Sequence, residues 1–480
     1  MLEIIKGVKN EAPFYYFEQI SKIPRASGNE EEVAKYIYSF ALSLSLDAYM
    51  DESYNVFVVK SASAGRENDE PIMLQAHTDM VAEKNVGTVH NFAKDPIKLI
   101  QNGNILSANG TTLGADDGFG VAVMMAVLAS DTISHPTVEC LFTSSEEIGL
   151  VGASKFDYSR VKSRRMINLD SAEDTTVIIG CCGGIRTEFT IPVSASSVDA
   201  DGIKITVGGL CGGHSGEDIN RGRLNSNIIM GKAIKHIMES CPVSLSYISG
   251  GDKDNAIPRE CEAIIVPSKE NLETCYTLAC ELEGLFKNEG IIKASEDNGL
   301  FIKAEIVHTD KVFTENDTNA ILKVLSVPNA VLKYRTEPPI LPERSRNLAR
   351  VRTKDGSVVI TFSSRAYVES GLALSTDELD TLAAEINASC YHHEKYPGWI
   401  SDKDSQLVID WQNAYEKVSK ERPEPTLIHA GLECGLISAE IPGLVAISVG
   451  CNVHDLHTPQ ETMEIDSMDR IYEAVIEILK

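Results

Sequence analysis

The sequence predicts an α/β protein that has a mixed, mainly parallel sheet flanked by helices, and an inserted α+β domain with an antiparallel sheet. Three observations support this class. Short apolar strands alternate with helices over residues 1–184, which is typical of a parallel sheet. The pattern changes to alternating apolar and polar strands over residues 185–396. The 480 residues are also too many for one ordinary core, so two domains are expected.

Residues 1–184 are expected to form the first part of a catalytic domain. Helical periodicity over residues 13–50 is interrupted at Pro24 and Gly28, and Asn29 is a candidate cap for the next helix. Strands are expected at 55–59, 71–76, 137–143 and 165–169, and an apolar helix is expected at 119–129. Several of these strands end at a histidine or a carboxylate. In open α/β sheets, such strand ends form sites at one edge of the sheet.

Residues 185–396 are expected to be the inserted domain, and residues 397–480 to be the second part of the catalytic domain. The insert contains strands such as 202–208 and 357–363 between amphipathic helices at 225–239 and 271–288. The final part is expected to contain a helix at 405–420, a strand at 444–449 and a closing helix that Asp466 can cap.

Composition excludes several classes of function. A formal net charge of −26 argues against nucleic acid and anionic membrane surfaces as partners. The N-terminus lacks the basic start and apolar core of a signal peptide, and no apolar run reaches the roughly 20 residues that span a bilayer. Eleven cysteines without CxxC spacing indicate reduced thiols, so we expect a cytoplasmic protein.

The expected strand at 137–143 is followed, after two serines, by two adjacent carboxylates, Glu146 and Glu147, and Gly149 comes two residues after them. Adjacent side chains on an extended chain point in different directions. The pair can therefore serve one site in two ways, one carboxylate binding a metal and the other moving a proton. The alternative is a solvated acidic turn. The polar residues at the other strand ends favour the site.

Seven such residues are candidates for one site: His77, Asp79, Asp116, Glu146, Glu147, Asp170 and His457. Mixed imidazole and carboxylate ligands suit zinc, or manganese or cobalt in the same geometry. Five of these seven residues are expected to be metal ligands. This is more than the three protein ligands that one catalytic zinc keeps. The excess indicates two metal ions roughly 3.5–4 Å apart that share a bridging carboxylate.

The residues of these motifs and their order along the chain resemble those of the co-catalytic dizinc peptidases related to carboxypeptidase G and aminoacylase. The resemblance covers essentially the whole chain. The matching pieces are His77-Thr-Asp79, Gly114-Ala-Asp116-Asp-Gly, Glu146-Glu147, Asn168-Leu-Asp170, His457-Thr-Pro, Gly212-Gly-His214-Ser-Gly, Asn255-Ala-Ile-Pro-Arg259 and His429-Ala-Gly-Leu-Glu-Cys-Gly435. The resemblance implies two Zn²⁺ per chain and a cis peptide bond after Asp116. It assigns the ligands as His77 and Asp170 for one zinc, Glu147 and His457 for the other, and Asp116 as the bridge.

The resemblance also implies catalytic roles outside the ligand set. Asp79 accepts the other ring N–H of His77. Glu146 is the general base, and His214 donates to the tetrahedral oxyanion. In dimeric relatives this histidine can come from the partner subunit, so a homodimer through the inserted domain is expected. His454 is the nearest decoy for His457, because only His457 has the Thr-Pro context.

Three further residues are candidates for substrate binding. Asn255 and Arg365 could hold the terminal carboxylate, since the arginine fork pairs with two carboxylate oxygens. Glu433 could recognise a free α-amino group. The implied activity is a dipeptidase for substrates with a free amino end, Xaa-His included. A tripeptidase, a carboxypeptidase and an N-acyl amino acid deacylase on the same scaffold remain alternatives, as does a non-catalytic binding protein.

Overall fold

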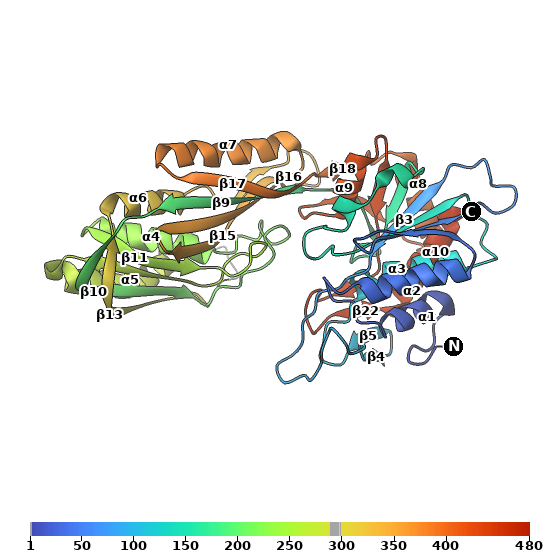
Figure 1. Cartoon of the computed structure of the whole chain (residues 1–480), viewed down its shortest axis with the longest axis horizontal. Helices are drawn as coiled ribbons and strands as arrows, with labels where there is room; N and C mark the ends of the chain where they lie inside the picture. Colours follow the sequence, from blue (N-terminus) through green and yellow to red (C-terminus); the bar gives the residue numbers. More distant parts are fainter. Residues whose placement is uncertain (1, 289–296, 298) are drawn as a thin grey trace. The chain divides into compact units, whose positions relative to one another are not determined.

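The computed structural model describes residues 2–288, 297 and 299–480 and divides the chain into two compact units (Figure 1). The first unit contains Met1–Cys181, Trp399–Leu427 and Leu432–Lys480. The second unit contains Cys182–Gly398 and the short segment Ile428–Gly431. This short segment had been expected in the catalytic domain. It groups with the second unit because its contacts lie there, and periodicity in the sequence does not report such contacts.

The first unit is built on a nine-stranded mixed sheet with the order β1-β2-β6-β3-β7-β20-β8-β18, and β19 pairs with β8. Its four central strands, β6, β3, β7 and β20, are parallel. The outer pairs β1–β2, β2–β6, β20–β8 and β8–β18 are antiparallel, so parallel pairing is confined to the centre. The strands are β1 (Asp47–Met50), β2 (Val56–Lys60), β3 (Ile72–His77), β6 (Val138–Thr143), β7 (Arg165–Asn168), β8 (Thr176–Cys181), β18 (Trp399–Ile400), β19 (Glu424–Ile428) and β20 (Val445–Ser448).

Helix α3 is the most deeply buried helix-forming segment of this unit. Every residue from Asp117 to Leu128 is buried, because the helix packs between strand β3 and helix α1. This burial explains why its sequence is apolar all round rather than on one stripe. The helices of the unit are α1 (Glu11–Ile20), α2 (Glu31–Ser43), α3 (Ala115–Ala129), α8 (Gln406–Ser419), α9 (Glu433–Glu440) and α10 (Ile465–Leu479).

Two expected helix caps are wrong by one or two residues. Glu30, not Asn29, is the N-cap of α2, and Glu464, not Asp466, is the N-cap of α10. Asp466 instead lies in the first turn of α10, where its negative charge interacts favourably with the helix dipole.

A small sheet with the order β21-β22-β5-β4 joins distant parts of the chain. Its strands are β4 (Leu99–Asn102), β5 (Ile105–Ala108), β21 (Val453–His454) and β22 (Thr462–Glu464).

The second unit is a nine-stranded antiparallel sheet with the order β13-β10-β12-β11-β15-β16-β9-β17, and β14 pairs with β15. Its apolar core lies between this sheet and its helices, of which α7 lies along β9, β16 and β17 (Figure 1). The alternating burial of strands such as β12 explains their alternating sequences. The strands are β9 (Gly183–Pro192), β10 (Ala195–Gly208), β11 (Val243–Gly250), β12 (Cys261–Pro267), β13 (Phe301–Phe313), β14 (Ala330–Tyr334), β15 (Pro342–Lys354), β16 (Ser357–Ala366) and β17 (Ser389–Tyr396). The helices are α4 (Ser226–Met238), α5 (Leu272–Asn288), α6 (Glu315–Val324) and α7 (Glu369–Glu385).

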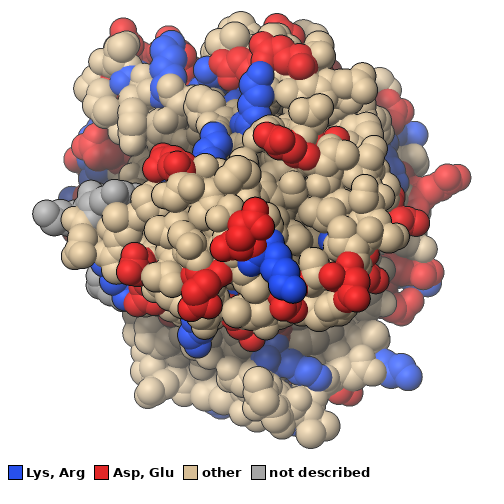
Figure 2. Space-filling view, turned by 90° about the vertical axis from the view of Figure 1, so that its left-hand side faces the viewer, with Lys and Arg blue, Asp and Glu red and all other residues tan. Residues whose placement is uncertain are grey.

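On the face shown in Figure 2, Asp and Glu side chains are interspersed with Lys and Arg. Among the described residues, no helix has both the length and the apolar composition needed to cross a membrane.

Candidate active site

The candidate residues of the first unit meet beyond the carboxyl ends of its central parallel strands. His77 is the last residue of β3, Glu146 and Glu147 follow β6, and Asp170 follows β7. Asp116 lies in the first turn of α3, and the peptide bond that follows it is cis, as the resemblance implied. Parallel strands bring residues from distant parts of the sequence to one edge of the sheet.

The two oxygens of Asp116 face two different histidines. Oδ1 lies 3.0 Å from His77 Nε2, and Oδ2 lies 3.1 Å from His457 Nε2. His77 Nε2 is also 3.7 Å from Asp170 Oδ1, and His457 Nε2 is 3.0 Å from Glu147 Oε1. These contacts form two donor groups, each of which could hold a metal ion: His77–Asp116–Asp170 and Asp116–Glu147–His457. They share one residue, Asp116.

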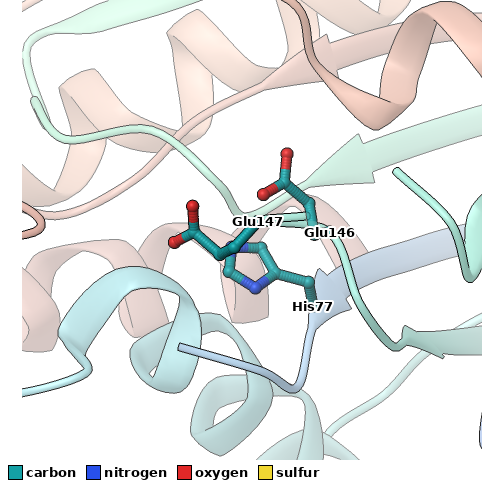
Figure 3. A group of neighbouring side chains, drawn as sticks. All are labelled: His77, Glu146 and Glu147. Atoms are coloured by element: carbon teal, nitrogen blue, oxygen red, sulfur yellow. The ribbon is translucent and has the colours of Figure 1, made fainter. Parts of the chain in front are cut away.

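A third donor group combines His77 with both Glu146 and Glu147. Figure 3 shows the imidazole at the end of β3 beside the two carboxylates, whose side chains diverge from adjacent positions. Glu146 therefore lies close enough to serve as a ligand, although the resemblance implied a base. His454 is not in any of the three groups formed by the described residues, and its Nε2 instead lies 3.2 Å from Glu464 Oε1.

The site contains more buried carboxylates than cations. Burial and the nearby Glu147 and Asp170 raise the pKa of Glu146 well above its ordinary value, although His77 opposes the shift. Burial by itself would lower the pKa of the His77 imidazole. Hydrogen bonds to Asp116 and Asp79 outweigh burial, so this pKa is raised. The carboxylates thus repel one another, and each histidine is drawn toward its cationic form by them. A divalent cation would remove both effects, since it binds carboxylate and neutral imidazole together.

The buried ligand-type atoms of the cluster face one another at short range. His77 Nδ1 lies 3.4 Å from Asp79 Oδ1, and Glu147 Oε1 lies 3.0 Å from His457 Nε2. The donor set is of the imidazole and carboxylate type that zinc, manganese and cobalt accept.

Asp79 is fully buried and holds the Glu146–Glu147 turn against β3. Its Oδ1 accepts the backbone N–H of Glu146 at 3.0 Å, and its Oδ2 accepts that of Glu147 at 3.2 Å. Ser27 Oγ donates to Oδ2 at 2.8 Å. Oδ1 also lies 3.4 Å from His77 Nδ1, which orients the ring. One carboxylate therefore fixes a candidate ligand, the candidate base and the imidazole.

Sequence reasoning missed four residues that support this site. Asp117 Oδ2 accepts the backbone N–H of His77 at 3.1 Å, and Ser27 binds Asp79. Arg25 and Glu461 bind backbone groups around Asp116. Asp117 belongs to the Gly114-Ala-Asp116-Asp-Gly motif, and Arg25 and Ser27 lie in the interruption between Pro24 and Gly28, but their residue types alone do not indicate these contacts. Glu461 carries no signal, because its partners are backbone amides more than 300 residues away.

The second unit brings His214, Asn255 and Arg365 together. Ser215 donates its backbone N–H to Asn255 O at 2.8 Å, and His214 forms a bridge with Ala256. A Cβ on Gly216 would lie 2.3 Å from the backbone oxygen of His429, so a glycine is needed here. The same Cβ position is 3.2 Å from both Arg365 Nε and His214 Cε1, which places the two side chains on either side of Gly216. Arg365 is nearly buried, and its Nη1 donates to the Tyr396 hydroxyl at 2.7 Å.

Glu433 lies in the first unit at the start of α9 and is fully buried. Its Oε2 accepts Gln75 Nε2 at 2.6 Å and Thr143 Oγ1 at 2.7 Å, while its Oε1 has no hydrogen-bond partner. Burial raises the pKa of this carboxyl to about 7. The side chain thus lies beneath the strand ends, without exposed surface.

The fold and this cluster together are typical of a metal-binding hydrolase of the α/β class. The comparisons with known proteins make the assignment more specific. The chain belongs to peptidase family M20/M25/M40, whose model matches residues 73–480, and it is a hydrolase that acts on peptide bonds. The resemblance stated above is therefore confirmed at the level of the peptidase family.

Two relatives that are 33% identical match almost the full length. The chain is 33% identical to the cytosol non-specific dipeptidase of Escherichia coli, over 97% of this chain and 96% of that protein. The crystal structure of aminoacylhistidine dipeptidase from Vibrio alginolyticus matches with a TM-score of 0.83 and 33% identity, covering 98% of this chain and 96% of that one. Aminopeptidase PepT from Bacillus cereus shares the fold, with a TM-score of 0.57, 16% identity and 98% of each chain covered.

Proposed function

We propose that this chain is a cytoplasmic, metal-dependent dipeptidase that acts on dipeptides with a free amino end, Xaa-His among them. The observation that carries the proposal is the sharing of Asp116 by two donor groups, because a shared carboxylate is the hallmark of a two-metal site. The dipeptidase names of the two full-length relatives support the substrate class.

The donors fit two divalent cations, with Zn²⁺ as the principal candidate and Mn²⁺ or Co²⁺ as alternatives. In this proposal His77 and Asp170 hold one ion, Glu147 and His457 hold the other, and Asp116 bridges them. When bound, the ions supply the Lewis acidity that activates a water molecule and polarises the scissile carbonyl. The remaining work belongs to side chains of the chain itself.

Glu146 is the proposed general base. No hydrogen bond to its carboxylate is found within the described residues, so the group is available for a proton, and its backbone is fixed by Asp79. Burial is the largest cause of the raised pKa of Glu146, and this cause favours a proton on the carboxyl whether or not metal is bound. In the proposed reaction Glu146 takes a proton from the attacking water and passes it to the leaving amine. Asp79 keeps His77 oriented while this happens.

Substrate groups are assigned to both units. His214 is proposed to donate to the oxyanion, and Asn255 and Arg365 to hold the terminal carboxylate of the dipeptide. The convergence of these three residues within the second unit supports a common role. Glu433 remains the proposed partner of the α-amino group, on the ground that its Oε1 has no hydrogen-bond partner. This role requires a movement that opens the carboxylate to substrate, because the side chain is fully buried in this structure.

We also propose that the second unit acts as a lid and that the chain is a homodimer through it. A lid that meets both ends of a short substrate leaves polar groups unpaired when the substrate is longer or blocked, which enforces dipeptide length. Strands β13 and β17 stand at the two ends of the strand order and each pairs with one neighbour among the described strands, so each offers an edge for such an interface.

The experiment is hydrolysis of a substrate panel before and after chelation, with metal added back. We expect activity on Xaa-His and other dipeptides, little on tripeptides and N-acylated dipeptides, loss on chelation and recovery with Zn²⁺, Mn²⁺ or Co²⁺. Comparable rates on blocked or longer substrates would refute the dipeptidase assignment. Activity that survives complete metal removal would refute the metal requirement.

A pair of histidine variants provides a matched control for the ligand assignment. His457→Ala should reduce the metal content by about one ion per chain. His454→Ala, three residues earlier in the same segment, should retain full metal content, since its imidazole faces Glu464. Equal loss in both variants would show that the segment, and not the His457 side chain, is what matters.

A further inference from the structure

Glu461 holds the segment that leads into Asp116 by its backbone. The carboxylate is 2% exposed and accepts the N–H groups of four successive residues. Its Oε2 accepts Leu113 N at 2.8 Å and Gly114 N at 3.0 Å, and its Oε1 accepts Ala115 N at 2.8 Å and Asp116 N at 3.4 Å. A charged acceptor for four backbone donors fixes the path of this segment more firmly than any single hydrogen bond.

Arg25 binds the same segment through a carbonyl oxygen, whereas Glu461 binds it through N–H groups. Its guanidinium is 2% exposed, and it donates to the carbonyl oxygens of Thr78 and Asp79, each at 3.0 Å, and to that of Gly114. A Cβ on Gly114 would lie 2.7 Å from Arg25 Nη2, and Gly114 has a φ of +71°, so glycine is required here on both counts. The N–H groups of residues 113–116 are thus bound by an anion, and a carbonyl of the same segment is bound by a cation.

These two side chains connect the segments that supply the candidate ligands of both metal positions. Arg25 binds the backbone just after His77, and Glu461 lies four residues after His457. Both bind the segment that ends in Asp116, whose two oxygens face those two histidines. The position of Asp116 relative to both histidines therefore depends on Glu461.

We propose that Glu461 is a positioning residue that sets Asp116 for both metal positions at once, so that the two ions depend on one buried carboxylate that touches neither. This inference rests on the proposed two-metal function. It predicts an effect that the loss of a ligand to one ion alone does not produce. Removing His457 weakens one position, whereas removing the charge of Glu461 displaces the shared Asp116 and weakens both.

Glu461→Gln is the sharpest perturbation. The variant has the same size, but one oxygen becomes an NH₂ group that faces two backbone N–H donors and cannot accept from them. Two of the four backbone N–H groups then lose their acceptor inside the protein. The matched control is Glu464→Gln, which removes the same charge three residues away, where the carboxylate binds Asn452 and His454 instead.

The measurement is equilibrium dialysis of the full chain against Zn²⁺ and Mn²⁺, with elemental analysis of bound metal. We expect wild type and Glu464→Gln each to bind two ions, with the same pair of affinities in both proteins. Glu461→Gln should bind both ions about 10–100-fold more weakly, the range expected for residues that orient ligands. His457→Ala should lose one ion and keep the affinity for the other within a few fold.

Folding is checked by circular dichroism and by the Tm in chelator. A folded Glu461→Gln with wild-type affinity for both ions would overturn the inference, as would an equal loss in Glu464→Gln. If the glutamine variant does not fold, Glu461→Asp decides, because it keeps the charge but shortens its reach. Weaker binding of both ions by that variant supports the inference, and failure of both variants to fold without metal overturns it. Absence of metal from wild type would instead refute the proposed function.

Discussion

Glu146→Gln separates a base from a ligand at the centre of the site. The substitution keeps the size of the side chain and removes its charge. Because the carboxylate accepts no hydrogen bond from the described residues, the amide breaks none, and it relieves the repulsion from Glu147 and Asp170 that raises the pKa of Glu146. We therefore expect the stability of the metal-free chain to be unchanged or slightly higher.

The expected loss lies in turnover. A positioned general base contributes about 10²–10⁴-fold to the rate, which corresponds to about 3–5 kcal/mol of transition-state stabilisation. We expect kcat to fall by this factor on a good dipeptide, with KM and metal content close to wild type. The assay combines steady-state kinetics with elemental analysis of the same preparation. Glu147→Gln is the neighbouring control, and it should lose metal as well as activity.

Two results would refute the reasoning. Wild-type kcat in Glu146→Gln would exclude the side chain as the base. Loss of an ion in this variant would instead make Glu146 a ligand, as its place in the group with His77 and Glu147 permits. The division of labour proposed for the pair would then be wrong.

Three other predictions follow from single contacts. Asp116→Asn should reduce binding of both ions and abolish turnover, as measured by metal analysis and kinetics; retention of either ion at wild-type affinity contradicts the bridge. Arg365→Lys should raise KM for dipeptides about tenfold with a smaller change in kcat, because lysine cannot pair with both carboxylate oxygens; an unchanged KM contradicts carboxylate binding. Burial, with Arg365 nearby, lowers the pKa of His429 to about 3. Below about pH 6.5 the unfolded chain therefore binds a proton that the folded chain does not, and the free energy of unfolding decreases as the pH is lowered. That loss is about 2 kcal/mol between pH 7.5 and 5. His429→Gln should remove this difference in denaturant unfolding of the chelated chain, and an unchanged pH profile contradicts it.

His429 also shows why a motif can be visible when its role is not. The sequence marks the His429-Ala-Gly-Leu-Glu-Cys-Gly435 loop as part of the resemblance. In the structure the imidazole is 5% exposed, with Nδ1 2.9 Å from Cys182 Sγ and Nε2 2.7 Å from Ser345 Oγ. Its partners come from residues 247 and 84 positions away in the chain. A sequence pattern reports residue types and spacing, and it does not report such partners.

The fold class and the candidate ligands could be predicted because both leave local signals. Short apolar strands between helices indicate a parallel centre, and a strand that stops at His77 or just before Asp170 marks one edge of the sheet. Strand pairing at the flanks was less predictable. The outer strands β1, β2, β8 and β18 pair antiparallel because of connections that apolar periodicity does not encode.

The sequence by itself determined which side chains could bind metal and which pair of carboxylates could divide two tasks, since residue type and strand position suffice for both. The tertiary structure decided that Asp116 turns one oxygen to each histidine, and that Glu146 is within reach of both roles. It also revealed Arg25 and Glu461. These two act on backbone N–H and C=O groups, which every residue has, so only their distances in the folded chain distinguish the groups that they bind.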